Sequence, residues 1–142
     1  MRLASLALLL VSPLAAAQEP KAADKVEVQA EVVLAAKEGN ELDPPALKAM
    51  QQAFAENKVT YTYLKRVHEQ RVPVTVKAAQ VKLPNGKIAS IVLEKLKADV
   101  ATIRVEVAPT RAVYTPGQKG NLYVPGGKHD GKDVWLVLSP AK

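Results

Sequence analysis

The sequence predicts a mostly β (α+β) fold: an antiparallel sheet or small β-sandwich of about seven or eight strands, with one amphipathic helix after the first strand. Three observations support this. Apolar and polar residues alternate with a period of two along most of the chain, short turn motifs separate these stretches, and only one segment has helical spacing. The first alternating stretch runs from Val26 to Leu34 and is typical of a strand with one buried face.

The helix is expected after a loop at residues 37–40. Asp43 is the expected N-cap, and Pro44 occupies the first helical position, where its missing N–H costs nothing. Asn57 is the expected end, which gives a helix of about 13 residues. The apolar stripe along it predicts packing on a sheet, although a partner-binding helix would carry the same stripe: Leu47, Met50 and Phe54.

The segments after the helix predict a series of strands. Residues 60–68 are rich in Thr and Tyr, and an extended chain would place Tyr61 and Tyr63 on one face. Residues 72–76 alternate, with Pro73 indicating an edge or a strand start. Asn85-Gly86 is a strong hairpin motif after the strand at residues 81–83.

The second half of the chain continues the pattern. Residues 88–96 are apolar on both faces, which indicates a central strand, and Ala98-Asp99 is an expected turn into a strand at residues 100–107. The remaining expected elements are a strand at 112–114, a type II turn at Pro116-Gly117, a short strand at 121–124, a loop at 125–127 and a final strand at 134–138.

Residues 1–17 have the features of a cleavable secretory signal peptide. Arg2 supplies the positive charge, residues 3–11 are apolar except for Ser5, and Ala15-Ala16-Ala17 provides small residues before Gln18. A membrane-spanning helix would need about 20 apolar residues, roughly twice this run, and a lipoprotein would need a cysteine at the cleavage site. We therefore expect a flexible leader at 18–25, a single β-rich domain at 26–142 and no transmembrane segment in the mature chain.

The chain contains no cysteine. An exported domain without disulfides is typical of bacterial periplasmic or secreted proteins, and thiol catalysis and cysteine-based metal sites are excluded. The stability of such a domain must come from core packing and strand pairing.

Basic charge is concentrated in the second half. Residues 18–70 carry 7 basic and 9 acidic side chains, whereas residues 71–142 carry 12 basic and 5 acidic ones. Such asymmetry can mark a surface that binds anionic polymers or lipid headgroups, and it can equally reflect the solvent faces of strands. The candidate anion-binding residues are Lys82, Lys87, Lys95 and Lys97.

The histidines and aspartates of the chain form no recognisable catalytic or metal-binding motif. His68 and His129 have no metal-ligand spacing, and Asp130 and Asp133 around Gly131 resemble a calcium loop only weakly. No cofactor is therefore expected.

The serines and glycines are equally uninformative. Ser90 and Ser139 lie outside any nucleophile motif, and Gly126-Gly127 fits a plain turn better than an anion-binding loop. No pair of carboxylates stands out as a glycosidase-type site.

Nucleic-acid binding is disfavoured. Stacking of bases would draw on Tyr61, Tyr63 and Lys65, with Tyr123, but the export signal and the 4% aromatic content argue against it.

The order of several sequence features resembles that found in a loose set of small exported proteins of unknown function from bacteria with an outer membrane. The resembling parts are Asp43-Pro44, Tyr61 to Leu64, Leu83 to Gly86, Pro125 to Gly127 and Val134 to Leu138. The resemblance implies compartment and fold only, because no functional residue can be carried over.

The sequence thus predicts an exported, periplasmic or secreted, non-enzymatic interaction module with an envelope protein as its partner. The alternative is a binder of anionic envelope polymer or lipid through the basic C-terminal half.

Overall fold

The computed structural model describes residues 24–97, 100–116 and 120–141. The predicted signal peptide, most of the leader and the predicted turn at Ala98-Asp99 lie outside the described residues, as does Gly117. Among the described residues, no helix is long and apolar enough to cross a membrane.

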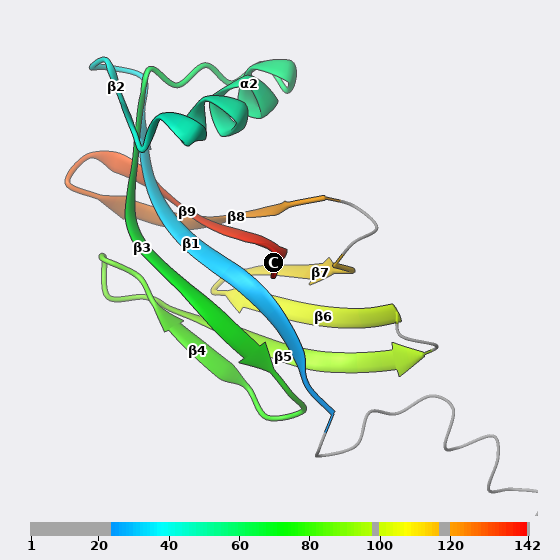
Figure 1. Cartoon of the computed structure of the whole chain (residues 1–142). Coiled ribbons are helices and arrows are strands. Elements are labelled where there is room, and N and C mark those ends of the chain that lie inside the picture. Colours follow the sequence, from blue (N-terminus) through cyan, green and yellow to red (C-terminus); the bar gives the residue numbers. More distant parts are fainter. Residues whose placement is uncertain (1–23, 98–99, 117–119, 142) are drawn as a thin grey trace, which may run out of the picture.

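The described residues form two β-sheets and one short helix (Figure 1), so the prediction of a mostly β fold with one helix is confirmed. The five-stranded sheet has the order β2-β3-β1-β9-β8, and the four-stranded sheet is the meander β4-β5-β6-β7. Nine strands are present in the described residues: β1 (Val26–Ala36), β2 (Glu41–Asp43), β3 (Tyr63–Val74), β4 (Ala79–Lys82), β5 (Ile88–Lys97), β6 (Val100–Val107), β7 (Thr110–Tyr114), β8 (Leu122–His129) and β9 (Lys132–Pro140).

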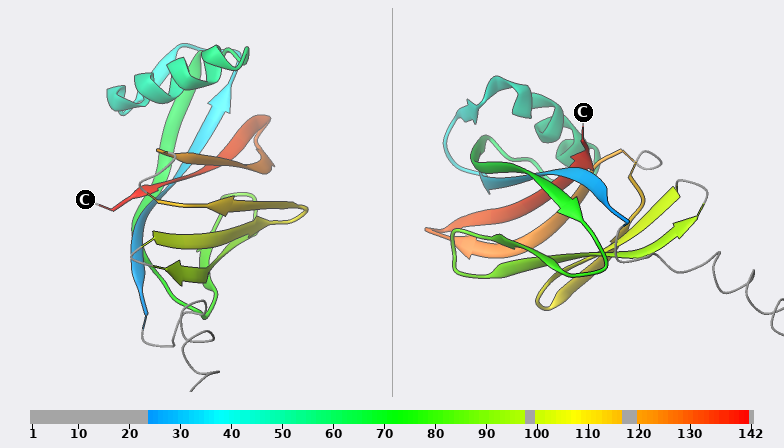
Figure 2. Two further views of the ribbon diagram at one scale, coloured as in Figure 1. Left: turned by 90° about the vertical axis from the view of Figure 1, so that its right-hand side faces the viewer. Right: turned by 60° about the horizontal axis from the view of Figure 1, so that its bottom comes forward.

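The five-stranded sheet is the middle layer of three. One of its faces packs against the four-stranded sheet through a large apolar cluster, and the other face is partly covered by the helix α2 (Lys48–Glu56) (Figures 1 and 2). We call these the inner and the outer face. The central strand β1 pairs with β3 on one side and with β9 on the other, both antiparallel.

The prediction that the first strand has one buried face is wrong at its C-terminal end. Val32 and Leu34 point into the inner cluster, as alternation predicts, but Val33 and Ala35 are also buried, under the helix. A strand in the middle layer loses solvent on both faces, and sequence alternation cannot show which residues a helix will cover.

The helix begins differently from the prediction. Asp43 is not the N-cap, because it ends β2, a short strand that pairs in parallel with β3 and that the sequence did not indicate. A 3₁₀ turn (Pro45–Leu47) starts the helical segment after Pro44, with no side-chain cap. Asn57 is the C-cap as predicted, and the predicted apolar stripe is buried: Leu47, Met50 and Phe54.

The prediction that Tyr61 and Tyr63 lie on the same face of a strand is also wrong. Strand β3 begins at Tyr63, and it runs unbroken to Val74 instead of forming two strands. Tyr61 precedes the strand and packs in the cluster under α2, whereas Tyr63 contacts the inner cluster. Pro73 fits the long strand because β2 pairs only with residues 63–65 and leaves the β3 edge free at that point.

Three predictions for the four-stranded sheet are confirmed. The turn at Asn85-Gly86 joins β4 to β5, with Gly86 at φ +89°, and β5 is central in its sheet. Strand β6 alternates as predicted, with four residues buried: Ala101, Ile103, Val105 and Val107.

The predicted loop at residues 125–127 is wrong, because β8 continues through it with an irregularity in its pairing to β9. Gly126 is buried on the inner face, where a Cβ atom would lie 2.8 Å from Leu83 Cδ1 and 3.2 Å from Val134 Cγ1. Asn85 also ties the sheets together here, since its Nδ2 donates to the carbonyl of Gly126 at 2.7 Å. Gly126 is therefore a packing glycine.

Replacing Gly126 with alanine is expected to lower the free energy of unfolding by about 1–3 kcal/mol, because the added methyl group overpacks a tightly filled contact between the sheets. Urea unfolding measures the change. Adding Leu83→Val to the Gly126→Ala variant should recover part of the lost free energy of unfolding. If the effects of the two substitutions simply add, the close contact between residues 83 and 126 is contradicted.

Candidate functional site

The outer face of the five-stranded sheet carries a groove along one flank of α2. It consists of two separate hollows that have Tyr123 in both linings: a polar hollow of about 460 Å³ and an aromatic hollow of about 310 Å³. Together they form what we call the helix-flank groove. Pocket volumes of about 300–1,000 Å³ are usual for small-ligand sites.

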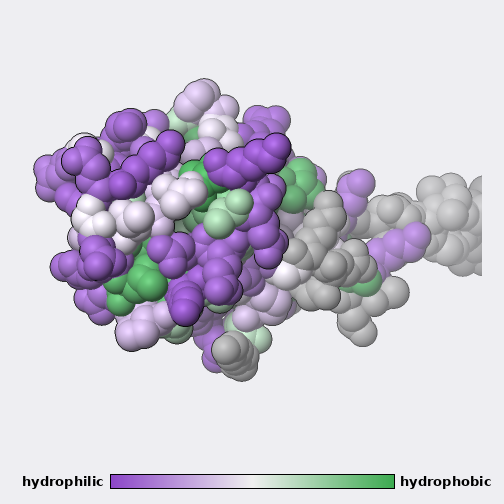
Figure 3. Space-filling model, turned by 90° about the horizontal axis from the view of Figure 1, so that it is seen from above, coloured by the Kyte–Doolittle hydropathy of each residue, from purple (hydrophilic) through white to green (hydrophobic). Residues whose placement is uncertain are grey.

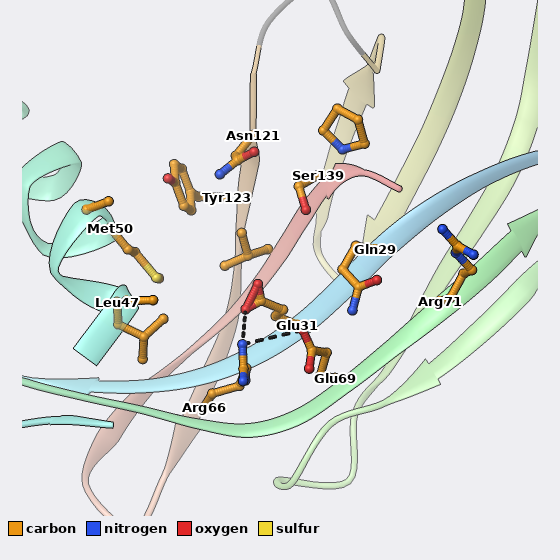
Figure 4. A pocket seen from close by; sticks show the side chains of 14 residues that line it. Gln29, Glu31, Leu47, Met50, Arg66, Glu69, Arg71, Asn121, Tyr123 and Ser139 are labelled. Atoms are coloured by element: carbon orange, nitrogen blue, oxygen red, sulfur yellow. Dashed lines mark hydrogen bonds and ion pairs between the residues drawn. The ribbon is translucent and has the colours of Figure 1, made fainter. Parts of the chain in front are cut away.

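The polar hollow lies where α2 leaves the sheet uncovered (Figure 4). Strands β1, β3 and β9 contribute polar side chains in register, since Gln29 is opposite both Arg71 and Ser139. Directly paired residues of neighbouring strands share one face, so the pairing places these groups together. The polar lining consists of Gln29, Glu31, Arg66, Glu69, Arg71, Asn121, Tyr123 and Ser139.

The charged groups of the polar hollow compensate one another. Arg66 Nη1 lies 3.2 Å from Glu31 Oε2 and 3.4 Å from Glu69 Oε2 (Figure 4), and Arg71 Nε lies 3.2 Å from Glu27 Oε1. The four charged residues that line the hollow therefore sum to zero: Glu31, Glu69, Arg66 and Arg71.

The aromatic hollow collects most of the aromatic side chains of the chain. Only six exist, and four of them lie here. Phe54 is their centre, with ring centroids 5.2 Å from Tyr61, 5.3 Å from Tyr123 and 4.7 Å from Trp135. Phe54 and Tyr61 are buried as the floor, whereas Tyr123 and Trp135 are partly exposed.

The side chains that the helical segment contributes to the edges of both hollows are mostly small. Ala46 and Ala49 line the polar hollow, and Ala53 and Asn57 line the aromatic one. Seen from the side of α2 (Figure 3), apolar patches interrupt a largely hydrophilic surface.

A hydrogen-bond chain orients Trp135. Its Nε1 donates to Tyr61 Oη at 3.1 Å, and the Tyr61 hydroxyl donates to Asp133 Oδ2 at 2.7 Å. Asp133 also pairs with Lys128, whose Nζ lies 3.5 Å from Oδ1. These hydrogen bonds hold the indole in one orientation.

Burial raises the pKa of Tyr61 above its ordinary value of about 10, and the hydrogen bond to Asp133 raises this pKa further, while the bond from Trp135 lowers it. The folded state therefore holds the phenolic proton more tightly than the unfolded state. This stabilisation is complete below about pH 10 and is lost as the pH rises through the folded pKa.

Tyr61→Phe is expected to lower the free energy of unfolding at neutral pH by about 1–3 kcal/mol, because Trp135 Nε1 and the Asp133 carboxylate each lose a partner. The variant should also lose less stability than the wild type as the pH rises above about 10. Urea unfolding across this range measures both effects. Some alkaline loss should remain, since burial also raises the pKa of Tyr114; an unchanged pH dependence would contradict the role of Tyr61.

The four lysines proposed for anion binding do not form one cluster. Lys82 and Lys87 flank the turn between β4 and β5, whereas Lys95 and Lys97 lie at the other end of β5. Lys97 lies ten positions after Lys87, which corresponds to about 33 Å along an extended strand. All four side chains are exposed, and Lys87 Nζ donates to the carbonyl of Ala108 at 3.2 Å.

The histidines lie on different strands of one sheet. His68 on β3 contacts Gln70, with 2.6 Å between Nε2 and Oε1, and His129 on β8 lies 3.5 Å from Asp130. Two strands separate β3 from β8, which places the strands about 14 Å apart. Among the residues that the structure describes, no group of three or more His, Asp or Glu could hold a metal ion.

The other residues considered from sequence are dispersed. Ser90 lies in the four-stranded sheet, and Ser139 lies in the polar hollow. Tyr61 and Tyr123 are on the outer face, whereas Tyr63 is on the inner side, so the tyrosines weighed for base stacking do not share one face.

Sequence reasoning missed the helix-flank groove. Most of its polar residues lie on four different strands, β1, β3, β8 and β9, where they look like ordinary solvent-facing side chains in the sequence. The one available signal was the sole tryptophan, Trp135, on the partly exposed side of an otherwise apolar strand.

Comparison of the chain with protein-family models, curated proteins and solved structures finds no match.

Proposed function

We propose that the chain is an exported, non-enzymatic interaction module that binds its ligand in the helix-flank groove. The observation that carries the proposal is the gathering of four of the six aromatic side chains around one surface hollow that adjoins a hydrogen-bonding hollow. Binding sites are concave, largely apolar and supplied with a few oriented polar groups, and the groove has this composition.

The rigidity of the site supports binding. Trp135 is fixed by Tyr61, and Arg66 is fixed by two glutamates. A ligand would therefore meet side chains that lose little conformational freedom when it binds.

The test is retention of envelope material by the mature chain, residues 18–142, on a column. A detergent extract of bacterial envelopes is passed over the wild type and over Tyr123→Ala and Asn121→Ala, and bound protein and saccharide are analysed. We expect material that the wild type retains and both groove variants lose. Thermal unfolding of each variant checks that it is folded.

The matched control is Val113→Ser. Val113 is 54% exposed and lies on the outward side of the four-stranded sheet, away from the groove. This variant should retain the same material as the wild type. Retention that survives both groove substitutions, or turnover of the bound material by the purified chain, would overturn the proposal.

Export is tested separately. When the whole chain is produced in a bacterium with two membranes, we expect it outside the cytoplasm with Gln18 as its first residue, by fractionation and mass spectrometry. Deletion of residues 2–17 should keep it in the cytoplasm. An unprocessed wild-type chain in the cytoplasm would contradict export.

The alternative function, binding of an anionic envelope polymer or lipid, would require a ligand that contacts both ends of β5. Retention on heparin that weakens steeply with salt is its expected signature. Charge reversal of Lys82 and Lys87 in one variant, and of Lys95 and Lys97 in another, would then each reduce retention. Unchanged retention in both variants would exclude it.

A further inference from the structure

We infer that the ligand of the helix-flank groove is a neutral oligosaccharide lying along α2. This inference rests on the proposed function and names the ligand class for the same site.

The charge of the groove points to a neutral ligand. Arg66 is compensated by Glu31 and Glu69, and the charged lining of the polar hollow sums to zero. An anionic or cationic ligand would therefore gain no net attraction from the hollow, and it would have to displace existing ion pairs.

The hydrogen-bonding groups point to a ligand rich in hydroxyl groups. Gln29 and Asn121 provide both donors and acceptors, and Ser139 and Tyr123 provide hydroxyls. A sugar hydroxyl can donate and accept at once, so it can replace the water bound to such groups. A lipid tail would remove that water without replacing the hydrogen bonds, which costs free energy.

The aromatic hollow completes this chemistry. The C–H face of a pyranose ring is apolar and packs on flat aromatic rings, and Tyr123 and Trp135 are the two partly exposed rings of the hollow. Tyr123 lines both hollows, so a chain stacked on it would reach the polar groups at one end and the indole at the other.

The length of the groove favours an oligomer over a single sugar. The lining residues of the helix flank run from Ala46 to Asn57, a span of about 16 Å at the rise of an α-helix. This exceeds one pyranose ring.

The experiment uses the sole tryptophan as its reporter. The mature chain is titrated with maltohexaose, cellohexaose and hexa-N-acetylchitohexaose, following Trp135 fluorescence and the heat of binding. We expect at least one of these neutral hexasaccharides to bind and change the emission, with less than about a twofold change in Kd between low and high salt, because no counterions are released.

Variants locate the binding. Tyr123→Ala should weaken it at least about tenfold by removing a stacking ring, and Asn121→Ala, an exposed substitution that leaves the fold intact, about three- to tenfold by removing a hydrogen bond. Val113→Ser and the Lys82→Glu/Lys87→Glu pair should bind as the wild type does. Equal binding by Tyr123→Ala and Asn121→Ala would overturn the inference.

The titration and the column experiment together distinguish this inference from the proposed function. If all three hexasaccharides fail to bind, the neutral-oligosaccharide inference is overturned. If the material retained in a groove-dependent way is instead a protein or a phospholipid, the proposed function stands and this inference fails. If no retention depends on the groove, the proposed function itself fails.

Discussion

Replacing Phe54 with alanine is expected to lower the free energy of unfolding by about 3–5 kcal/mol, the usual cost of removing a buried aromatic ring. Phe54 is 7% exposed and touches the rings of Tyr61, Tyr123 and Trp135. Its loss would leave the C-terminal end of α2 without an anchor. Domains of this size are stable by only about 5–15 kcal/mol, so the loss is a large share of the total.

Urea unfolding and Trp135 fluorescence together check this prediction. Phe54→Leu is the control, because it keeps most of the apolar volume and should cost less than about half as much. Trp135 should show a shifted emission in the alanine variant, since it loses the ring that covers it. A cost below about 1 kcal/mol would mean that the aromatic cluster does not hold the helix.

Leu136→Ala is expected to lower the free energy of unfolding by about 2–5 kcal/mol. Leu136 is fully buried in the apolar cluster between the two sheets, and it stands opposite Val32 on β1 and Val124 on β8. The neighbouring strands are fixed by their ladders, so the cavity cannot collapse easily and the cost should lie in the upper part of this range.

Val113→Ala is the matched control for Leu136→Ala. It also shortens an apolar strand residue, but one that is 54% exposed, and it should change stability by less than about 0.5 kcal/mol. Urea midpoints of the two variants, measured together, give the comparison. Equal costs at the two positions would contradict the burial of Leu136 between the sheets.

Local patterns were sufficient for most of the elements. The alternation in β6, the Asn85-Gly86 turn and the Leu47, Met50 and Phe54 stripe each depend on nearby residues alone, and each is found where it was predicted. The errors fall where a distant segment decides the outcome. Gly126 has the pattern of a loop glycine in the sequence, and only the fold shows that Leu83, from the turn between β4 and β5, occupies the space where its side chain would lie.

The candidate site could not be predicted from the sequence, because it also depends on contacts between distant segments. Its polar and aromatic walls come from β1, β3, α2, β8 and β9, which meet only after the sheet has formed. The lysines chosen from net charge look close along the chain, but an extended strand carries Lys87 and Lys97 far apart.

The sequence by itself determined the mostly β fold class, the single amphipathic helix with its buried stripe and the central position of β5, because periodicity and turn chemistry are local properties. It also supplies the prediction of export through residues 1–17. Only the tertiary structure decided that β1 is buried on both faces, that β8 runs through Gly126 and that four aromatic side chains gather beside a charge-balanced hollow. Those features depend on strand order and on the placement of α2, which arise from contacts between segments remote in the chain.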